Sequence, residues 1–152
     1  MAGSGGLAEV FLPFGGASEE VRRQELEERY PGAGESALTR QAAHLLERYF
    51  AGEAVLFPLQ LDLSGCTEFQ KSVYGVVSAI PYGKVMTYRE VAMALGRPQA
   101  ARGVGSAMAA NRLPIIIPCH RVVGSGGALT GYSGPGGVES KEWLLALERS
   151  KK

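Results

Sequence analysis

The chain has 152 residues, of which 45% are hydrophobic and 20% are charged, with 21 Gly, 8 Pro and 2 Cys. This length suits one compact domain or two small ones that share a core, and the charged fraction argues against intrinsic disorder. No stretch approaches the roughly 18 apolar residues that cross a bilayer, and the first residues lack the basic and apolar regions of a secretory signal. Two distant cysteines, Cys66 and Cys119, make no disulfide framework, so we expect a cytoplasmic, reducing location and no membrane contact.

The net charge of +1 hides an uneven distribution. Residues 1–65 carry five Arg against ten acidic residues, a net charge of −5, whereas residues 66–152 carry eleven Lys and Arg against five Glu, a net charge of +6. A basic C-terminal half is expected of a protein that binds a polyanion. Chance asymmetry in a small protein is the alternative that remains open at this point.

The first 65 residues are weakly patterned. Residues 7–14 and 55–63 predict strands, and residues 17–34 predict an irregular acidic connection. Residues 36–50 predict a helix, because apolar side chains recur at three-to-four spacing. His44 lies in that helix, where a structural or surface role is favoured over ligation. This part therefore predicts a scaffold.

The sequence patterns that mark helix starts and ends are clearer from Thr67 onwards. Thr67 and Thr87 each begin a sequence typical of a helix-capping box, and Gly96 ends the second of these helices. Pro98 fits the first turn of a further helix over residues 99–110. Two short helices joined by a glycine-containing turn form a helix-turn-helix pattern, which is structural in many proteins and binds DNA in others.

The helix predicted over residues 99–110 is almost bare, with Arg102 as its one charged side chain. Gly103 and Gly105 each cost about 1 kcal/mol relative to Ala in a helix interior. Such a sequence indicates close approach of the backbone to another surface, either a neighbouring helix or a DNA groove. In a minor groove, Arg102 would enter the base stack.

A candidate for thiol chemistry follows. Residues 113–118 predict a short buried strand between prolines that leads directly into Cys119 and His120. A helix is expected over residues 138–149, and Glu148 stands at the end disfavoured by the helix dipole, so it is either solvated or held by a specific partner. A neighbouring imidazole and a carboxylate can generate a thiolate. An adjacent Cys–His pair also arises by chance. The spacing of the two cysteines and two histidines along the chain matches no zinc-ligand pattern.

Pro118-Cys-His-Arg-Val122 resembles the active-site motif of the O6-alkylguanine-DNA alkyltransferases, or methylated-DNA–protein-cysteine methyltransferases. The similarity covers roughly the last 86 residues, and the first 65 agree only in length and in ending with an apolar strand. Its further elements are Thr67–Gln70, Ile80-Pro-Tyr-Gly83, Thr87-Tyr88, Ala100-Ala-Arg-Gly-Val-Gly105, Asn111, Gly131-Tyr-Ser133 and Lys141–Glu148. The resemblance implies an α/β fold, with a small ribonuclease-H-like sheet domain over residues 1–65. Residues 66–152 would form a helical, winged-helix-like DNA-binding and alkyl-transfer domain with the helix-turn-helix.

The resemblance implies DNA repair by direct reversal. Double-stranded DNA containing an alkylated guanine would be bound through its minor groove, the base flipped out, and the alkyl group moved irreversibly to Cys119, once per molecule. O4-methylthymine is a further substrate that the sequence leaves open. We expect no cofactor, no metal and a monomeric protein.

The same resemblance implies a role for each matching residue. His120 and Glu148 would relay a proton, with a water between the cysteine and the histidine. The other residues implied in catalysis are Tyr88, which donates toward the purine, and Asn111, which braces the turn before the cysteine. The residues implied in DNA or substrate binding are Arg102 in the base stack, Val122 and Cys119 through their carbonyls, Tyr132 beside the alkyl group, the Ser133 N–H on O6, and Thr87, Ala101, Gly105 and Arg121.

Three features depart from the family pattern. Residues 133–140 form a loop about two residues longer than is common, and Cys66 stands where we expect only a small packed side chain. The N-terminal half also lacks the Cys and His cluster that holds a structural zinc in some relatives, which is why we expect no metal. Three other classes of protein remain as alternatives: a damage sensor, which would lack the acceptor thiol, a thiol hydrolase using Cys119 and His120, and a helix-turn-helix regulator.

Overall fold

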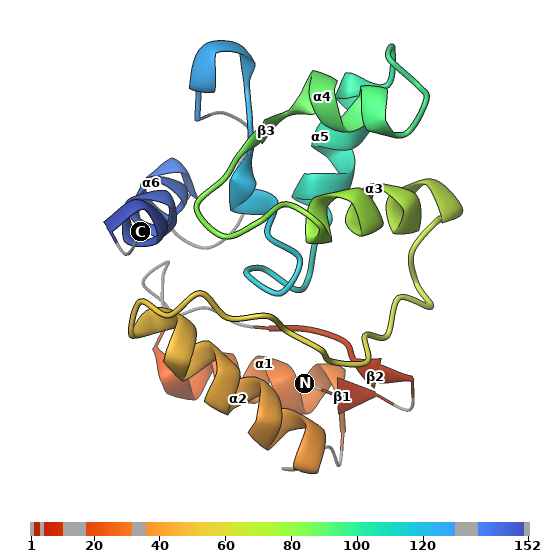
Figure 1. Cartoon of the computed structure of the whole chain (residues 1–152). Coiled ribbons are helices and arrows are strands. Elements are labelled where there is room, and N and C mark those ends of the chain that lie inside the picture. Colours follow the sequence, from red (N-terminus) through yellow and green to blue (C-terminus); the bar gives the residue numbers. More distant parts are fainter. Residues whose placement is uncertain (1, 4, 11–17, 32–35, 130–136, 151–152) are drawn as a thin grey trace.

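The computed structural model describes residues 2–3, 5–10, 18–31, 36–129 and 137–150. Helices dominate, and the strands are very short. In chain order the elements are β1 (Ala2–Gly3), β2 (Gly6–Leu7), α1 (Glu19–Arg29), α2 (Ala37–Phe50), α3 (Glu68–Ser78), β3 (Met86–Thr87), α4 (Tyr88–Ala94), α5 (Ala101–Ala109), η1 (Cys119–Arg121), β4 (Val122–Val123), η2 (Ser125–Gly127) and α6 (Gly137–Ser150). Figure 1 shows two layers, one with α1, α2, β1 and β2 and the other with α3 to α6.

The N-terminal layer differs from the sequence prediction in two places. The predicted connection over residues 17–34 contains α1, which Ser18 caps by accepting from the Val21 N–H. The predicted strand over residues 55–63 is an extended segment without strand structure, which meets β2 in one parallel bridge, Leu7 to Leu61. Of the strand predicted over residues 7–14, the structure has β2 at its start, and residues 11–17 lie outside the described part.

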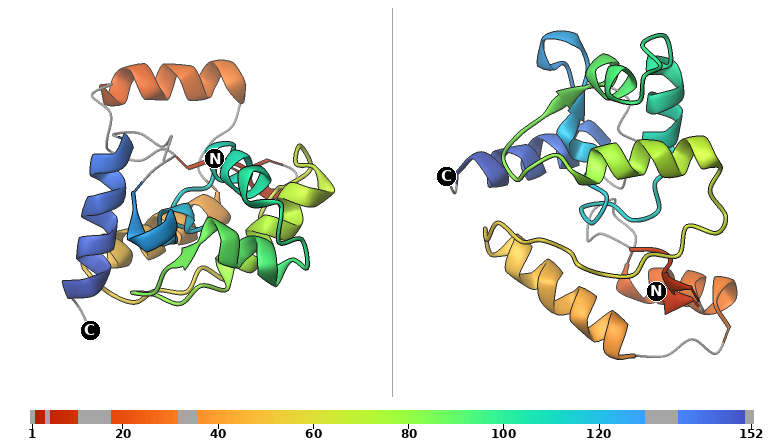
Figure 2. Two further views of the ribbon diagram at one scale, coloured as in Figure 1. Left: turned by 90° about the horizontal axis from the view of Figure 1, so that it is seen from above. Right: turned by 45° about the vertical axis from the view of Figure 1, so that its right-hand side comes forward.

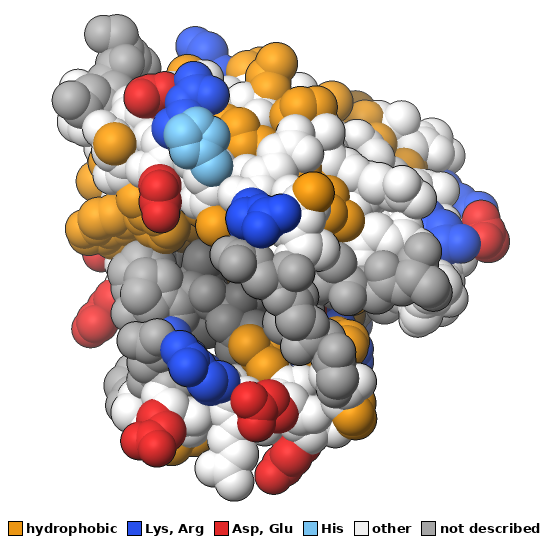
Figure 3. Space-filling model, turned by 90° about the horizontal axis from the view of Figure 1, so that it is seen from below, with side chains coloured by type: hydrophobic (Ala, Val, Ile, Leu, Met, Phe, Trp, Pro, Cys, Tyr) orange, Lys and Arg blue, Asp and Glu red, His pale blue; other side chains and the backbone are white. Residues whose placement is uncertain are grey.

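The predicted helix over residues 36–50 is confirmed as α2, and its capping residue Ser36 accepts from the Thr39 N–H at 3.2 Å. His44 is exposed on this helix. Acidic and basic side chains are interspersed on the face of the molecule that the N-terminal layer presents (Figure 3). The described side chains on this face therefore carry charges of both signs, whereas a surface that binds a polyanion is expected to carry mainly positive charge.

The helix-turn-helix pattern is present as α4, a turn and α5. Both predicted capping boxes form: the Thr67 hydroxyl accepts from the Gln70 N–H, and the Thr87 hydroxyl accepts from the Glu90 N–H. Helix α5 begins at Ala101, so Pro98 lies before the helix and not in its first turn. Figure 1 and the right-hand view of Figure 2 show α4 and α5 on the side of the molecule away from α1 and α2.

The segment before Cys119 is buried as expected, but it is a turn and not a strand. The chain folds back on itself, with an isolated bridge from Pro114 to Ile117, and Ile115 has a φ of 72°. Proline has no N–H to donate to a neighbouring strand, so two prolines in six residues favour this local closure. The small parallel sheet forms one step later, where Met86 and Thr87 of β3 pair with Val122 and Val123 of β4.

One hydrophobic core connects the two layers. Leu7 of β2 and Ala42 of α2 belong to the same buried cluster as Val73, Val104 and Cys119. A second cluster joins Tyr49 of α2 with Ile115 and with Leu144 of α6. The site that begins at Cys119 is therefore built on elements from both layers. The division at residue 65, and the ribonuclease-H-like and winged-helix descriptions, remain predictions from the resemblance.

Candidate active site

Cys119 opens a single 3-10 turn, η1, directly after the proline-flanked segment. The Cys119 N–H donates to the Ile117 carbonyl at 2.7 Å, and the Arg121 N–H donates to the Pro118 carbonyl at 2.9 Å. These bonds fix the backbone on both sides of the thiol, which is 5% exposed. Burial raises the pKa of Cys119, although hydrogen bonding from Asn111 and the charge of Lys141 act in the opposite direction. The resting thiol therefore needs a base to become a nucleophile.

His120 and Glu148 meet inside the protein, where both side chains are fully buried. His120 Nε2 lies 2.9 Å from Glu148 Oε1 and 3.3 Å from the hydroxyl of Tyr49, which itself donates to Glu148 Oε1 at 3.0 Å. Burial lowers the pKa of His120, outweighing the hydrogen bond and the charge of Glu148, so the imidazole is neutral. Glu148 is therefore held by specific partners, the second of the two alternatives that the sequence left open.

The partners of His120 fix which nitrogen carries its proton. A carboxylate accepts only, so Nε2 donates to Glu148 Oε1, and Nδ1 is left with a lone pair. Nδ1 is buried and has no hydrogen-bond partner among the residues that the structure describes. An unprotonated, unoccupied ring nitrogen in the residue after Cys119 can accept a proton, directly or through a water.

Arg121 is buried and contacts Glu148, which corrects the expectation that it binds DNA or substrate. Its Nη2 and Nε donate to Glu148 Oε1 at 2.6 and 2.9 Å, and Nη1 donates to the Ile80 carbonyl at 2.8 Å. Burial would raise the pKa of Glu148, but hydrogen bonds from His120 and Arg121 and their charges outweigh it and lower the pKa to about 2. The carboxylate is thus ionised at neutral pH.

Lys141 of α6 lies on the other side of the site. Its Nζ donates to the Val122 carbonyl, and it lies 5.7 Å from the ring centroid of Tyr88, the first residue of α4. Burial lowers the pKa of Lys141 and raises that of Tyr88. The Val122 carbonyl expected to accept from a guanine amine therefore already has one donor, and a second lone pair remains.

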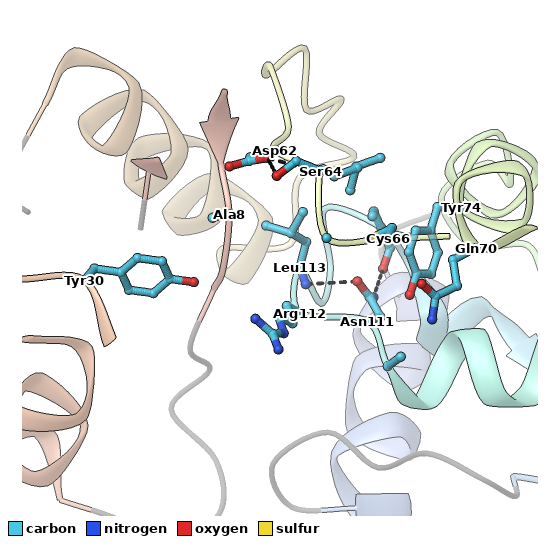
Figure 4. A pocket seen from close by; sticks show the side chains of 14 residues that line it. Ala8, Tyr30, Asp62, Ser64, Cys66, Gln70, Tyr74, Asn111, Arg112 and Leu113 are labelled. Atoms are coloured by element: carbon cyan, nitrogen blue, oxygen red, sulfur yellow. Dashed lines mark hydrogen bonds between the residues drawn. The ribbon is translucent and has the colours of Figure 1, made fainter. Parts of the chain in front are cut away.

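Asn111 braces the turn before Cys119 as expected. Its Nδ2 donates to the Ile117 carbonyl and its Oδ1 accepts from the Leu113 N–H, both at 2.9 Å. It also lines a pocket of about 410 Å³, shown in Figure 4, whose wall contains Cys66 and Tyr74 but not Cys119. This pocket is therefore not the site of thiol chemistry. Cys66 is partly buried, in keeping with its interpretation as a packed residue.

The structure places the residues predicted to face DNA in different surroundings. Arg102 is exposed on α5, and Ala101 and Gly105 are partly exposed on the same helix. The Thr87 hydroxyl instead caps α4. A Cβ on Gly103 would lie 3.1 Å from the Phe69 ring, so this glycine is explained by a neighbouring helix, α3. Tyr132 and Ser133 lie outside the described residues.

Two residues of the site are not predicted from the sequence. Tyr49 fits the apolar stripe of the helix over residues 36–50, although a buried tyrosine hydroxyl needs a partner, which is a usable signal. Lys141 belongs to the motif over residues 141–148, and nothing local indicates that a lysine there is 1% exposed. Within the described ranges, no three His, Cys, Asp or Glu side chains group as metal ligands, and no helix is long and apolar enough to span a membrane.

The fold and the site define a class of protein: a helix-turn-helix beside a buried cysteine that is backed by a histidine and a glutamate. Comparison with known proteins agrees. The family described as "6-O-methylguanine DNA methyltransferase, DNA binding domain" matches residues 68–150. Methylated-DNA–protein-cysteine methyltransferase of Methanosarcina barkeri is 50% identical over 111 residues, which are 73% of this chain and 68% of the relative.

Solved structures give the same result. The crystal structure of Mycobacterium tuberculosis OGT in complex with DNA superimposes with a TM-score of 0.79 at 38% identity, covering 99% of this chain and 85% of the other. O6-methylguanine-DNA methyltransferase from the hyperthermophilic archaeon Pyrococcus kodakaraensis gives 0.55 at 28% identity, covering 85% and 78%. The chain belongs to the 6-O-methylguanine DNA methyltransferase family.

Proposed function

We propose that this chain repairs DNA by direct reversal, moving the alkyl group from O6 of an alkylated guanine in double-stranded DNA to its own Cys119. The observation that carries this proposal is the buried Cys119 followed by a buried His120, whose Nε2 faces Glu148 and whose Nδ1 has no partner among the described residues. Relatives at about half identity carry the name methylated-DNA–protein-cysteine methyltransferase.

The chemistry is one nucleophilic displacement. His120 Nδ1 takes the proton of the Cys119 thiol, and Glu148 stabilises the resulting imidazolium through Nε2–H. The sulfur forms a bond to the alkyl carbon while the bond from that carbon to O6 breaks. The electron pair goes to the guanine, which finally takes up the proton. A thioether does not leave again, so each molecule reacts once and needs no cofactor.

DNA binding is assigned to α4, the turn and α5. Arg89, Arg97 and Arg102 are exposed on these elements, and the solved relative from M. tuberculosis is a complex with DNA. Contacts to phosphates give sequence-independent binding, which a protein that searches for damage needs. The small residues of α5 suit close approach to the minor groove, with Arg102 filling the gap that the flipped base leaves.

The flipped base would lie against the site from the side of Tyr88. The hydroxyl of Tyr88 donates toward the purine, and the carbonyls of Val122 and Cys119 accept from its exocyclic amine. Tyr132 and the Ser133 N–H lie outside the described residues, and their contacts to the alkyl group and O6 remain predictions from the resemblance. O4-methylthymine presents the same alkyl–oxygen bond and is a second possible substrate. A monomeric state and a cytoplasmic location remain predictions from the sequence.

The experiment that tests this proposal follows the DNA. The protein is mixed in excess with a duplex that carries one O6-methylguanine, and the digested nucleosides are quantified. Conversion of O6-methylguanosine to guanosine by the wild-type protein, and not by Cys119→Ala, is the expected result. Binding of the duplex without conversion would instead favour a damage sensor.

A further inference from the structure

Tyr49 connects the N-terminal layer to the proton relay. It lies in the last turn of α2, is fully buried, and has its hydroxyl 3.0 Å from Glu148 Oε1 and 3.3 Å from His120 Nε2. Its ring lies edge-on to those of His120 and Tyr82, with centroid distances of 6.4 and 6.0 Å. Among the described residues of the N-terminal layer, Tyr49 is the one that hydrogen-bonds to His120 and Glu148.

The directions of these hydrogen bonds follow from the acceptor. Because ionised Glu148 only accepts, the Tyr49 hydroxyl donates its proton to Oε1, and its oxygen lone pairs face the N–H of His120 Nε2. Both groups within reach of Nε2 therefore require it to be protonated. Tyr49 thus favours the same tautomer as Glu148, the one that leaves Nδ1 as an acceptor.

The charged and titratable groups around this hydroxyl come from three elements. They are His120 and Arg121 of η1, Glu148 of α6, and Tyr82 of the turn after α3, with Lys141 of α6 acting on His120 at longer range. Arg121 competes with His120 for Glu148, since its guanidinium also contacts Oε1. The Tyr49 hydroxyl is a further donor to Oε1 and helps to keep that oxygen within hydrogen-bond distance of the imidazole. Burial raises the pKa of Tyr49, so its hydroxyl keeps its proton.

We propose that Tyr49 is a positioning residue for the transfer reaction: it holds Glu148 and His120 in the arrangement in which Nδ1 takes the proton of Cys119. This inference rests on the proposed function. It gives the N-terminal layer a part in the chemistry in addition to its structural role. In a variant that lacks the Tyr49 hydroxyl, methyl transfer should therefore be slower only under conditions in which His120 removes the thiol proton of Cys119.

The test is the single-turnover rate of methyl transfer from an O6-methylguanine duplex as a function of pH, for the wild type, Tyr49→Phe and Tyr82→Phe. At pH 7, Tyr49→Phe should be about tenfold slower, the order expected when one hydrogen bond to a charged group is lost. The deficit should shrink toward pH 9–10, because hydroxide then forms the thiolate without His120. A deficit of equal size at every pH, or none, would overturn the proposal.

Tyr82→Phe is the matched control, because its hydroxyl donates to the Gly52 carbonyl at 3.4 Å and not to the relay. It should keep the wild-type pH profile. A second measurement needs no variant: ring ¹⁵N NMR of the wild type, which has only two histidines, His120 and the exposed His44. Nε2 of His120 should be protonated and Nδ1 unprotonated, and the reverse would overturn the proposal. If the wild type itself transfers no methyl group, the proposed function fails first.

Discussion

Replacement of Arg121 by methionine separates the buried role of this arginine from a role in DNA binding. In the structure Arg121 neutralises Glu148 and donates to the Ile80 carbonyl, and its side chain is 8% exposed. Methionine has a similar volume and no charge, so the variant fills the space but leaves the carboxylate without its closest cation. We therefore expect a loss of stability and no direct loss of DNA contacts.

The size of this loss follows from the cost of an unpaired buried charge. Breaking a buried ion pair from one side costs about 3–5 kcal/mol. Independently, the pKa of Glu148 falls from 4.5 to about 2 on folding, which at about 1.4 kcal/mol per pKa unit corresponds to roughly 3 kcal/mol. Arg121 supplies part of that sum, so a loss of about 2–3 kcal/mol is expected, or roughly 5–10 °C in Tm for a chain of this size.

The pH dependence gives a second signature. Because folding lowers the pKa of Glu148, the ionised carboxylate contributes fully to the free energy of unfolding of the wild type above about pH 4.5. This contribution is lost as the pH falls toward 2. In Arg121→Met the folded pKa lies nearer 4.5, so this acid-dependent loss should be smaller. Urea unfolding at pH 7 and pH 4, read by tryptophan fluorescence from Trp143, measures both effects.

The control is Arg102→Met, which removes an exposed arginine from α5 and should change the unfolding free energy by less than about 0.5 kcal/mol. The reasoning would be refuted if Arg121→Met unfolded like the wild type but bound duplex DNA less tightly, since the guanidinium would then face DNA and not Glu148.

Three further predictions follow from the same geometry. Arg102→Ala should slow methyl transfer from duplex DNA at least tenfold but leave transfer from free O6-methylguanine unchanged, and equal slowing on both substrates would contradict its role in the base stack. Because burial lowers the folded pKa of His120, the unfolded state binds its proton first, so the unfolding free energy should fall as pH drops from 7 to 5. In urea titrations of His120→Gln, the unfolding free energy should depend less on pH between 7 and 5. An unchanged pH dependence would show that other groups cause it. Methylated protein should unfold about 1–3 kcal/mol more easily than unmodified protein, since a methyl group on the buried Cys119 overpacks its surroundings, and an equal Tm in calorimetry would count against this.

The elements that the sequence predicted correctly are those with strong local signals. Capping residues and apolar periodicity specify α2, α3 and α4 within a residue or two of their ends. Helix α1 was missed because most of its side chains are exposed and carry no apolar stripe, although Ser18 followed by helix-forming residues was a readable start. An apolar run such as residues 113–118 fits a strand or a buried turn equally well until its neighbours are known.

The site was predictable to the extent that it lies in one stretch of sequence. Cys119 and His120 are adjacent, and Glu148 was singled out by its unfavourable place at a helix end. Tyr49 is 71 residues from His120, so its contact depends on how the two layers pack. The DNA-binding role of Arg121 is implied only by the family resemblance, and it is the packing of α6 against η1 that brings its guanidinium to Glu148.

The most direct measurement of the central claim is peptide mapping of the protein after reaction with an O6-methylguanine duplex. The chain supplies its own control, because Cys66 is a second thiol that is more exposed than Cys119 and lies outside the relay. A gain of one methyl group per chain, located on Cys119 and absent from Cys66, is the result that the structure predicts. Methylation of Cys66 instead, or of both thiols, would contradict the claim that His120 and Glu148 select the reacting sulfur.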